Sequence, residues 1–137
     1  MKILVFGLPG AGKTWLAERL IKYIENCAWY NADVVRKCAN DWDYSGEARV
    51  RQANRMKTFA DFERANGRWV ICDFVAPTKK TRETFAPDYT IWLDTIKESR
   101  YDDTNEMFET PDKINIHITH FMSDEEIKKL AEVIINV

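Results

Sequence analysis

The feature that most constrains the fold is an apolar run that leads directly into a glycine-rich turn. Residues 2–6 read Lys-Ile-Leu-Val-Phe, and residues 7–14 read Gly-Leu-Pro-Gly-Ala-Gly-Lys-Thr. The second stretch meets the pattern G-x-x-x-x-G-K-[ST], which lies between a buried strand and a helix and points backbone N–H groups at phosphate oxygens. The amphipathic residues that follow suit such a helix. The alternative is a Gly/Pro turn that happens to precede a helix, and the apolar strand before the loop and the amphipathic helix after it disfavour that interpretation.

Each residue type in this loop has a chemical task. Glycines let the backbone curl around phosphates, and the positive end of the following helix adds to the attraction. The lysine reaches the β- and γ-phosphates of ATP, and the threonine hydroxyl is a ligand for Mg²⁺. The residues expected to bind ATP through this loop are Gly7, Leu8, Pro9, Gly10, Ala11, Gly12, Lys13 and Thr14.

Composition indicates one ordinary domain over residues 1–137, with 45% apolar and 31% charged residues. The formal net charge of −2 offers no basic surface for a long nucleic acid or an anionic membrane, so neither partner is expected. No signal peptide or membrane-spanning run is recognisable, which favours a cytoplasmic protein. The chain has three cysteines without metal-ligand spacing, and free thiols in a reducing compartment are expected.

Apolar runs of strand length alternate with helical patterns along the chain. The predicted strands are residues 2–6, 27–30, 68–74, 89–93 and 114–118. The predicted helices are residues 13–25, 34–39, 46–65, 79–85 and a last one opened by a capping box at Ser123. Residues 97–106 are predicted as a solvated loop, and four tryptophans are expected in or near the core: Trp15, Trp29, Trp69 and Trp92.

This alternation predicts an α/β protein with the three-layer P-loop NTPase fold: a five-stranded parallel sheet covered by helices on both faces. Ligands of such sheets collect at the carboxyl ends of the strands. The glycine-rich loop follows the first strand at that edge. Polar residues that follow other strands are therefore candidates for the same site.

Three such residues stand out. Asp33 follows the second strand and could accept a proton from the phosphate acceptor or hold Mg²⁺ through water; alternatively, it could cap the next helix. Arg36 is spaced to grip an anionic group. Asp73 ends an apolar run, as does the acid that orients Mg²⁺ in many P-loop proteins, although a strand-end turn residue would look the same.

The glycine-rich loop alone does not identify the reaction, because switches, motors and kinases share it. A GTPase would normally carry N-K-x-D for guanine, and that tetrapeptide is absent. The chain is short for a motor. A small kinase is the natural remaining class.

Four segments resemble the adenylylsulfate kinase family, from the first strand to about residue 118. The family's D-G-D-N-V-R is similar to residues 31–36, Asn-Ala-Asp-Val-Val-Arg. Its F-S-x-x-D-R-x-E-N-I-R-R is similar to residues 44–55, its F-I-S-P-Y-R-x-x-R to residues 74–82, and its F-T-G-I-D-x-P-Y-E-x-P to residues 101–111. The resemblance implies a P-loop kinase that uses ATP and Mg²⁺ and takes a small nucleotide as acceptor.

The resemblance implies roles for particular residues. Asp33 falls on the family's second acid, a base or metal partner, beside Lys13 in catalysis. Arg36 and Arg49 fall on the arginines that bind the substrate's phosphosulfate. Gln52 replaces an asparagine that assists them, and Val75 lies in the third motif. The metal-binding candidates are Thr14, Asp33 and Asp73.

Tyr44 and Tyr101 occupy the places of two phenylalanines that clamp the acceptor's adenine, and tyrosine preserves a stacking face. The sequence also departs from the family. Asn31 replaces the first acid of D-G-D, and Ala76 replaces a serine. The family's basic lid of roughly twenty residues is almost absent, which leaves Arg100, Lys97, Lys79 and Lys80 as the only nearby cation candidates, and Arg100 is expected to bind ATP.

The predicted function is therefore phosphorylation of the 3′-hydroxyl of adenosine 5′-phosphosulfate. Two alternatives remain open. One is a P-loop kinase for another hydroxyl: a nucleoside, a polynucleotide 5′ end or a small metabolite. The other is a domain that binds ATP without catalysis. A chain without a lid could also obtain cover for its site from a second subunit, as a homodimer.

Overall fold

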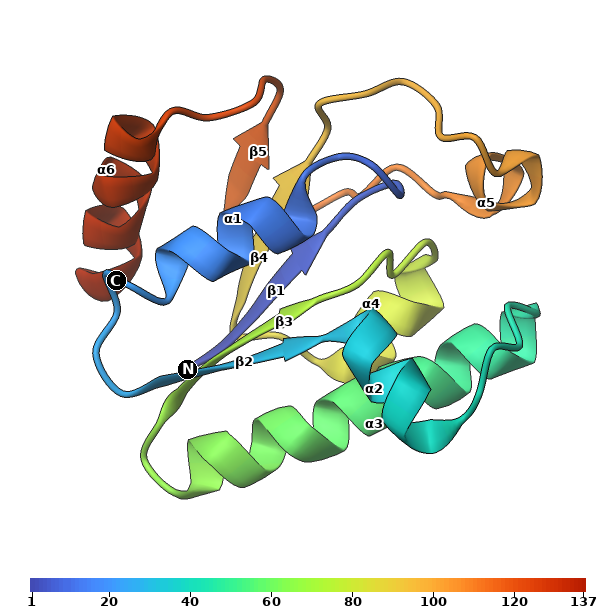
Figure 1. The fold of residues 1–137 in the computed structure, drawn as a ribbon, viewed down its shortest axis with the longest axis horizontal. Helices are drawn as coiled ribbons and strands as arrows, with labels where there is room; N and C mark the ends of the chain where they lie inside the picture. The colour runs from blue at the N-terminus through green and yellow to red at the C-terminus, as the bar shows by residue number, and fades with distance from the viewer.

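The computed structural model describes residues 1–137 and contains one parallel sheet of five strands in the order β2-β3-β1-β4-β5 (Figure 1). The strands are β1 (Lys2–Phe6), β2 (Cys27–Asn31), β3 (Trp69–Asp73), β4 (Tyr89–Leu93) and β5 (Ile116–Ile118). β1 lies at the centre, paired with β3 on one side and β4 on the other. The predicted α/β P-loop fold is confirmed.

Six helices accompany the sheet: α1 (Lys13–Leu20), α2 (Ala32–Ala39), α3 (Gly46–Ala65), α4 (Lys79–Phe85), α5 (Asp102–Met107) and α6 (Asp124–Ile135). α1 and α6 cover one face, and α2, α3 and α4 lie on the other (Figure 1). α5 lies off to one side of the strand ends, between β4 and β5 in the chain. No helix has the length and apolarity needed to cross a membrane.

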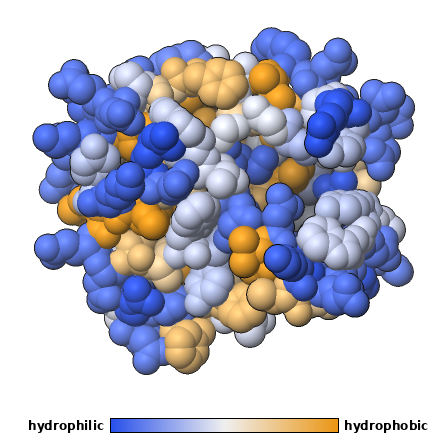
Figure 2. Space-filling view, in the orientation of Figure 1, coloured by the Kyte–Doolittle hydropathy of each residue, from blue (hydrophilic) through white to orange (hydrophobic).

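The two cores follow from the alternation of side chains along β1. Ile3 and Val5 point to the face covered by α1 and α6, whereas Leu4 and Phe6 point to the face covered by α3 and α4. All four are fully buried. Because the central strand is buried on both faces, it reads as a continuous apolar run rather than an alternating one. On the face shown in Figure 2, hydrophobic residues form small patches separated by hydrophilic ones.

Several element ends differ from the predicted ones. The first helix ends at Leu20 instead of residue 25, and the chain turns back through Asn26 at a φ of 52°. The last strand begins at Ile116 instead of residue 114. At Asn115 the backbone N–H still donates to the carbonyl of Thr90 at 3.2 Å, but the side chain accepts the hydrogen bond from Thr90 N at 2.8 Å. Such side-chain bonds compete locally with the ladder of a sheet.

The segment predicted as a loop over residues 97–106 contains a helix, so that prediction is wrong in part. α5 begins with two acids in its first turn, which favour a helix N-terminus. Its Thr104 is 3% exposed and accepts a hydrogen bond from Arg49. Trp15 is 38% exposed, so the expectation that it lies in the core is also wrong.

Candidate active site

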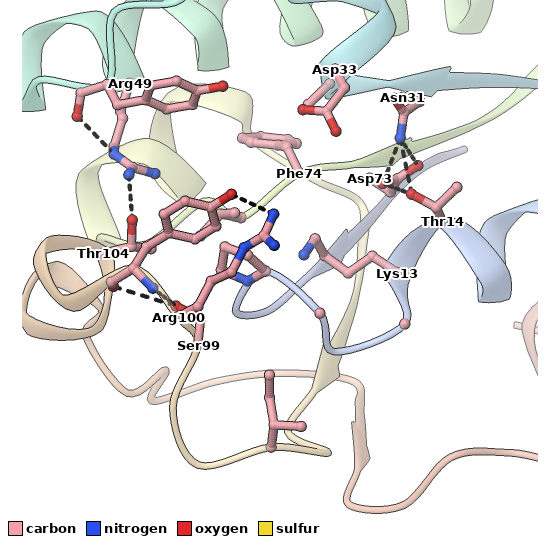
Figure 3. Close-up of a pocket in the computed structure, with 18 of the residues that line it drawn as sticks. Lys13, Thr14, Asn31, Asp33, Arg49, Asp73, Phe74, Ser99, Arg100 and Thr104 are labelled. Carbon is pink, nitrogen blue, oxygen red and sulfur yellow. Dashed lines mark hydrogen bonds between the residues drawn. The ribbon is translucent and has the colours of Figure 1, made fainter.

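A cleft of about 890 Å³ opens at the carboxyl ends of β1, β2 and β3. Its walls come from the loop before α1, the start of α2, the residues around the start of α3, the end of β3, and residues 96–104 (Figure 3). The expected site residues that line it are Pro9, Gly10, Gly12, Lys13, Thr14, Asp33, Tyr44, Arg49, Asp73, Val75, Arg100 and Tyr101. Segments distant in the sequence therefore converge on one cavity.

The glycine-rich loop takes a path that side chains would obstruct. A Cβ added to Gly7 would collide with the backbone carbonyl oxygen of Leu93. Gly12 caps α1 at a φ of 97°, in the left-handed region that favours glycine. These two positions explain why the motif needs glycine at its ends. Gly7, Leu8 and Ala11 form the turn without lining the cleft through their side chains.

Lys13 projects from the first residue of α1 into the cleft (Figure 3). Its Nζ donates a hydrogen bond to the backbone carbonyl of Leu8 at 3.0 Å. Loss of hydration lowers the pKa of Lys13 to about 8, although the negative charges of Asp73 and Asp33 partly oppose the shift. The ammonium group thus faces the cavity without a carboxylate in direct contact, and the negative charge of a phosphate would compensate for its lost hydration.

Asp73 is the centre of a polar cluster at the end of β3. Its carboxylate, in a residue 2% exposed, accepts hydrogen bonds from Trp29 Nε1 at 2.6 Å and from Asn31 Nδ2 at 3.2 Å. The Thr14 hydroxyl donates to it at 3.4 Å. Burial raises the pKa of Asp73, while these donors and Lys13 act in the opposite direction. Asp73 is therefore part of the site rather than a simple turn residue.

The neighbourhood of Asp73 also explains the departure at Asn31. An aspartate at that position would bring a second carboxylate against Asp73, whereas the amide donates to it and to the Thr14 hydroxyl at 3.1 Å. A hydroxyl beside a buried carboxylate fits Mg²⁺, which is usually held by one or two protein oxygens together with water and substrate phosphates. Thr14 and Asp73 fit such an ion.

Asp33 lies in the first turn of α2 and is exposed to the cleft (Figure 3). The alternative role as a helix cap is wrong, because the side chain of Asn31 caps α2 by accepting a hydrogen bond from Val34 N at 3.1 Å. The Asp33 carboxylate therefore does not cap α2. It is close enough to Lys13 to influence its pKa.

The far wall of the cleft carries aromatic rings and one buried arginine (Figure 3). Arg49, 7% exposed, donates from Nε to the carbonyl of Tyr44 at 3.0 Å and from one terminal nitrogen to the Thr104 hydroxyl at 2.7 Å. The second bond joins the start of α3 to α5 within this wall. Tyr44 and Tyr101 are each 44% exposed, so their rings remain accessible.

Arg100 comes from the short connection between β4 and α5. Its guanidinium donates to the Tyr101 hydroxyl at 2.8 Å and lies 5.0 Å from the centre of that ring. Arg100 is exposed and lines the same cleft as Lys13. The expected cation therefore lies at the mouth of the site, paired with an aromatic residue of the far wall.

Two expected substrate-binding residues, Arg36 and Gln52, do not line the cleft. Arg36 is 4% exposed and donates to the backbone carbonyls of Asp41 at 3.0 Å and Asp43 at 2.9 Å. Gln52 is 3% exposed and donates to the carbonyl of Ala32 at 3.1 Å. In this structure, both side chains hold the protein backbone.

The cleft also contains residues that were not anticipated: Trp15, Asn31, Phe74, Ile96, Glu98, Ser99, Asp103 and Thr104. Phe74 could have been found, because it opens the motif that also contains Val75. The residues of segment 96–104 carry no local pattern that would bring them to a cleft. Their place depends on the helix α5 and on the bond from Arg49 to Thr104.

Residues 1–95 match the family of adenylylsulphate kinases. The chain belongs to that family. Because this match ends before residue 96, Arg100 and Tyr101 lie outside it. Membership supports a P-loop kinase that binds ATP, and it leaves the acceptor open. No match was found among curated proteins.

Solved structures share the fold at low sequence identity. The adenylylsulphate kinase of Mycobacterium tuberculosis, in complex with AMPPNP and APS (adenosine 5′-phosphosulfate), aligns with a TM-score of 0.77 and 17% identity over 98% of this chain and 95% of that one. A sugar kinase of Janibacter aligns with a TM-score of 0.76 and 16% identity over 99% of this chain and 94% of that one. The shikimate kinase of Aquifex aeolicus aligns with a TM-score of 0.66 and 14% identity over 99% of this chain and 96% of that one. The same fold thus occurs in proteins named for different acceptors.

Proposed function

We propose that this protein transfers the γ-phosphoryl group of ATP to the 3′-hydroxyl of adenosine 5′-phosphosulfate. The observation that carries the proposal is the convergence of Tyr44, Arg49 and Tyr101 on the cleft that contains Lys13. Two accessible rings and a guanidinium opposite a phosphate-binding loop suit an acceptor with a base and an anionic tail. Family membership supports the transfer of a phosphoryl group from ATP, and the lining of the cleft is the argument for this particular acceptor.

Alignment and charge stabilisation supply the rate in phosphoryl transfer, with little covalent chemistry left to the protein. Lys13 would hold the phosphates and neutralise charge on the moving group. Asp33 would orient the acceptor hydroxyl and accept its proton. Thr14 and Asp73 would hold Mg²⁺, which neutralises phosphate charge when bound.

The acceptor would lie against the far wall. Tyr44 and Tyr101 would stack on its base, and stacking on an aromatic ring is worth about 1–3 kcal/mol per base. Arg49 uses Nε and one terminal nitrogen to bind protein oxygens, which leaves its other terminal nitrogen for an anionic group. Arg100 would approach the transferred phosphoryl group from the mouth of the cleft.

A second candidate is a kinase for an uncharged acceptor, such as a nucleoside or a small metabolite. The balance of charge in the cleft favours this candidate. The cations that line the cleft are Lys13, Arg49 and Arg100, and the carboxylates are Asp33, Asp73, Glu98 and Asp103. Arg36, which would add a cation, is occupied with backbone carbonyls. A doubly anionic acceptor would meet few unopposed positive charges.

An acceptor panel tests the proposal. Purified protein is incubated with labelled ATP and Mg²⁺ and with adenylylsulfate, adenosine or a sugar alcohol, and labelled product and ADP are quantified. We expect adenylylsulfate to stimulate ADP formation and to become labelled. Lys13→Ala should lower this turnover by at least about a hundredfold, as loss of one transition-state contact does elsewhere, while circular dichroism shows the same fold.

Other outcomes would change the conclusion. Labelling of adenosine or the sugar alcohol instead would favour the second candidate. Tight ATP binding with no labelled acceptor would favour a non-catalytic nucleotide-binding domain. Normal turnover in Lys13→Ala would remove the glycine-rich loop from the reaction.

A further inference from the structure

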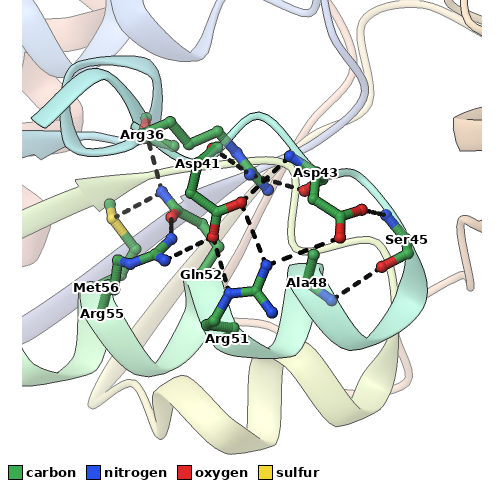
Figure 4. Close-up of polar contacts among 10 residues, drawn as sticks. Arg36, Asp41, Asp43, Ser45, Ala48, Arg51, Gln52, Arg55 and Met56 are labelled. Atoms are coloured by element: carbon green, nitrogen blue, oxygen red, sulfur yellow. Dashed lines mark hydrogen bonds and ion pairs between the residues drawn. The ribbon is translucent and has the colours of Figure 1, made fainter. Parts of the chain in front are cut away.

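The loop formed by residues 40–45, here called the Tyr44 loop, joins α2 to α3 and carries Tyr44 to the cleft. It begins at Asn40, which ends α2 at a φ of 50°. Four arginines outside it donate hydrogen bonds to it: Arg36 of α2 and Arg49, Arg51 and Arg55 of α3. Figure 4 shows Arg36, Arg51 and Arg55, with Gln52 bonded to Arg55. Such an array of charged groups behind a single exposed ring requires an explanation.

Arg36 holds the backbone of the Tyr44 loop directly. One of its terminal nitrogens donates to the carbonyls of Asp41 and Asp43. Its guanidinium lies 4.4 Å from the centre of the Tyr44 ring, within the range of a cation–π contact. Burial lowers the pKa of Arg36. The side chain therefore supports the ring from behind, and its bonds go to the loop rather than into the cleft.

Asp41 fastens the Tyr44 loop to α3. Its carboxylate accepts hydrogen bonds from Arg51 Nε at 2.8 Å and from a terminal nitrogen of Arg55 at 2.5 Å. A second nitrogen of Arg51 donates to the same carboxylate at 3.2 Å. Arg55 also donates to Gln52 Oε1 at 2.9 Å, and Gln52 donates to the start of α2. The Asp41 carboxylate thus joins the loop to α3, and Gln52 links Arg55 onward to α2.

The residues on either side of Tyr44 are held as well. The backbone N–H of Asp43 donates to the Asp41 carboxylate at 3.2 Å, and the N–H of Ser45 donates to the Asp43 carboxylate at 2.9 Å. Ser45 in turn caps α3 by accepting from Ala48 N. Tyr44 is therefore constrained at both neighbours while its own ring stays accessible.

We propose that Asp41 and Arg36 are positioning residues that fix the Tyr44 ring at the acceptor side of the cleft. Arg36 acts through the Tyr44 loop, rather than by binding an anionic group of the acceptor. A ring that is already ordered loses less conformational entropy when an acceptor stacks on it, so its affinity is higher. The effect on acceptor binding rests on the proposed function, whereas the effect on the loop does not.

Hydrogen exchange of the Asp41→Asn variant tests whether Asp41 fixes the Tyr44 loop. An amide presents a donor to Arg51 and Arg55 in place of an anionic oxygen, so the junction opens without a change of size. We expect the backbone amides of residues 43 and 45 to exchange at least about tenfold faster. Arg64→Gln is the matched control, because it removes another ion pair of α3, to Asp88 at 2.8 Å, far from the loop.

Arg51→Gln, at an exposed position, provides the same measurement should Asp41→Asn fold poorly; it should raise exchange at residues 43 and 45 by a smaller factor. Unchanged exchange in a folded Asp41→Asn or Arg51→Gln protein would overturn the positioning role of Asp41. The KM for adenylylsulfate should rise about fivefold or more in Asp41→Asn as ring order is lost. The KM for ATP should not change. Faster exchange with an unchanged KM for adenylylsulfate would also overturn the proposal.

The charge of the probe tests the role of Arg36. Calorimetry compares the binding of adenylylsulfate and of uncharged adenosine to wild type and to Arg36→Gln. Positioning through Tyr44 predicts the same fold-loss for both probes, whereas direct anion binding predicts a loss for adenylylsulfate alone. Should wild type bind neither probe, the proposed acceptor fails, and exchange at residues 43 and 45 in Arg36→Gln still decides whether this residue holds the loop.

Discussion

At the scale of single residues, Lys13 has an environment that differs strongly from water. Its pKa is lowered to about 8 by lost hydration, so the free protein carries this charge at neutral pH and loses it in mildly alkaline solution. Triphosphate at the site would favour the charged form, because an anion nearby raises the pKa of an ammonium group. Binding of ATP and protonation of Lys13 are therefore linked.

We predict that ATP binding takes up protons above about pH 8 and weakens as the pH rises further. Calorimetry in buffers of different ionisation enthalpy measures the uptake directly. The uptake should be small near pH 7, where Lys13 is already charged, and should approach one proton at higher pH. Lys13→Met serves as control and should take up none. An affinity independent of pH together with no uptake would contradict the lowered pKa.

The residue scale also shows what the sequence could reveal about the site. The positions of Lys13 and Thr14 in the cleft were predictable because a local motif determines the conformation of the loop that carries them. Arg36 was not predictable in the same way, because its partners are backbone carbonyls of a loop whose course depends on Asp41 and α3. A guanidinium that binds backbone and one that binds substrate look alike in sequence.

At the scale of elements, locally encoded helices were predicted well. Residues 46–65 and 79–85 form helices with the predicted bounds, and α6 begins where its capping box indicated. α5 was missed because Asp-Asp-Thr-Asn-Glu-Met has no apolar periodicity. Its position depends on the bond from Arg49 to Thr104, between residues far apart in the chain.

The capping box of α6 provides a prediction about stability. Ser123 accepts a hydrogen bond from Glu126 N at 3.2 Å, and the Glu126 side chain accepts from Ser123 N at 3.1 Å. Ser123→Ala should lower the free energy of unfolding by about 1 kcal/mol. Urea denaturation measures the change, with Lys128→Gln on the exposed face of α6 as a control that should be close to neutral. Equal stability of the two variants would mean that the cap contributes little.

At the scale of the whole molecule, the cleft is assembled from two parts of the chain. The first 75 residues supply the glycine-rich loop, Asp33, Tyr44 and Arg49, and residues 96–104 supply Arg100, Tyr101 and the rest of the far wall. The parallel sheet brings both parts to one edge, which is the reason that the fold and the place of the site were predictable together. The shape of the part formed by residues 96–104 was not predictable, since it depends on α5.

This division predicts separable stabilisation by two ligands. A non-hydrolysable ATP analogue at a hundred times its Kd should stabilise the protein by about 2.7 kcal/mol, and adenylylsulfate should add a further increment in wild type. In Tyr101→Ala the second increment should fall, while the first should persist, because Tyr101 lines the wall against which we propose that the acceptor binds. Thermal unfolding gives both values. Equal second increments in the two proteins would exclude Tyr101 from acceptor binding.

The direct connection from β4 to α5, residues 94–101, affects how efficiently ATP would be used. So short a segment leaves the mouth of the cleft accessible to solvent, and bulk water competes with any alcohol as the nucleophile. We expect idle release of inorganic phosphate from ATP when the acceptor is scarce. The ratio of hydrolysis to transfer would then rise as the acceptor concentration falls, and ATP would be consumed without product.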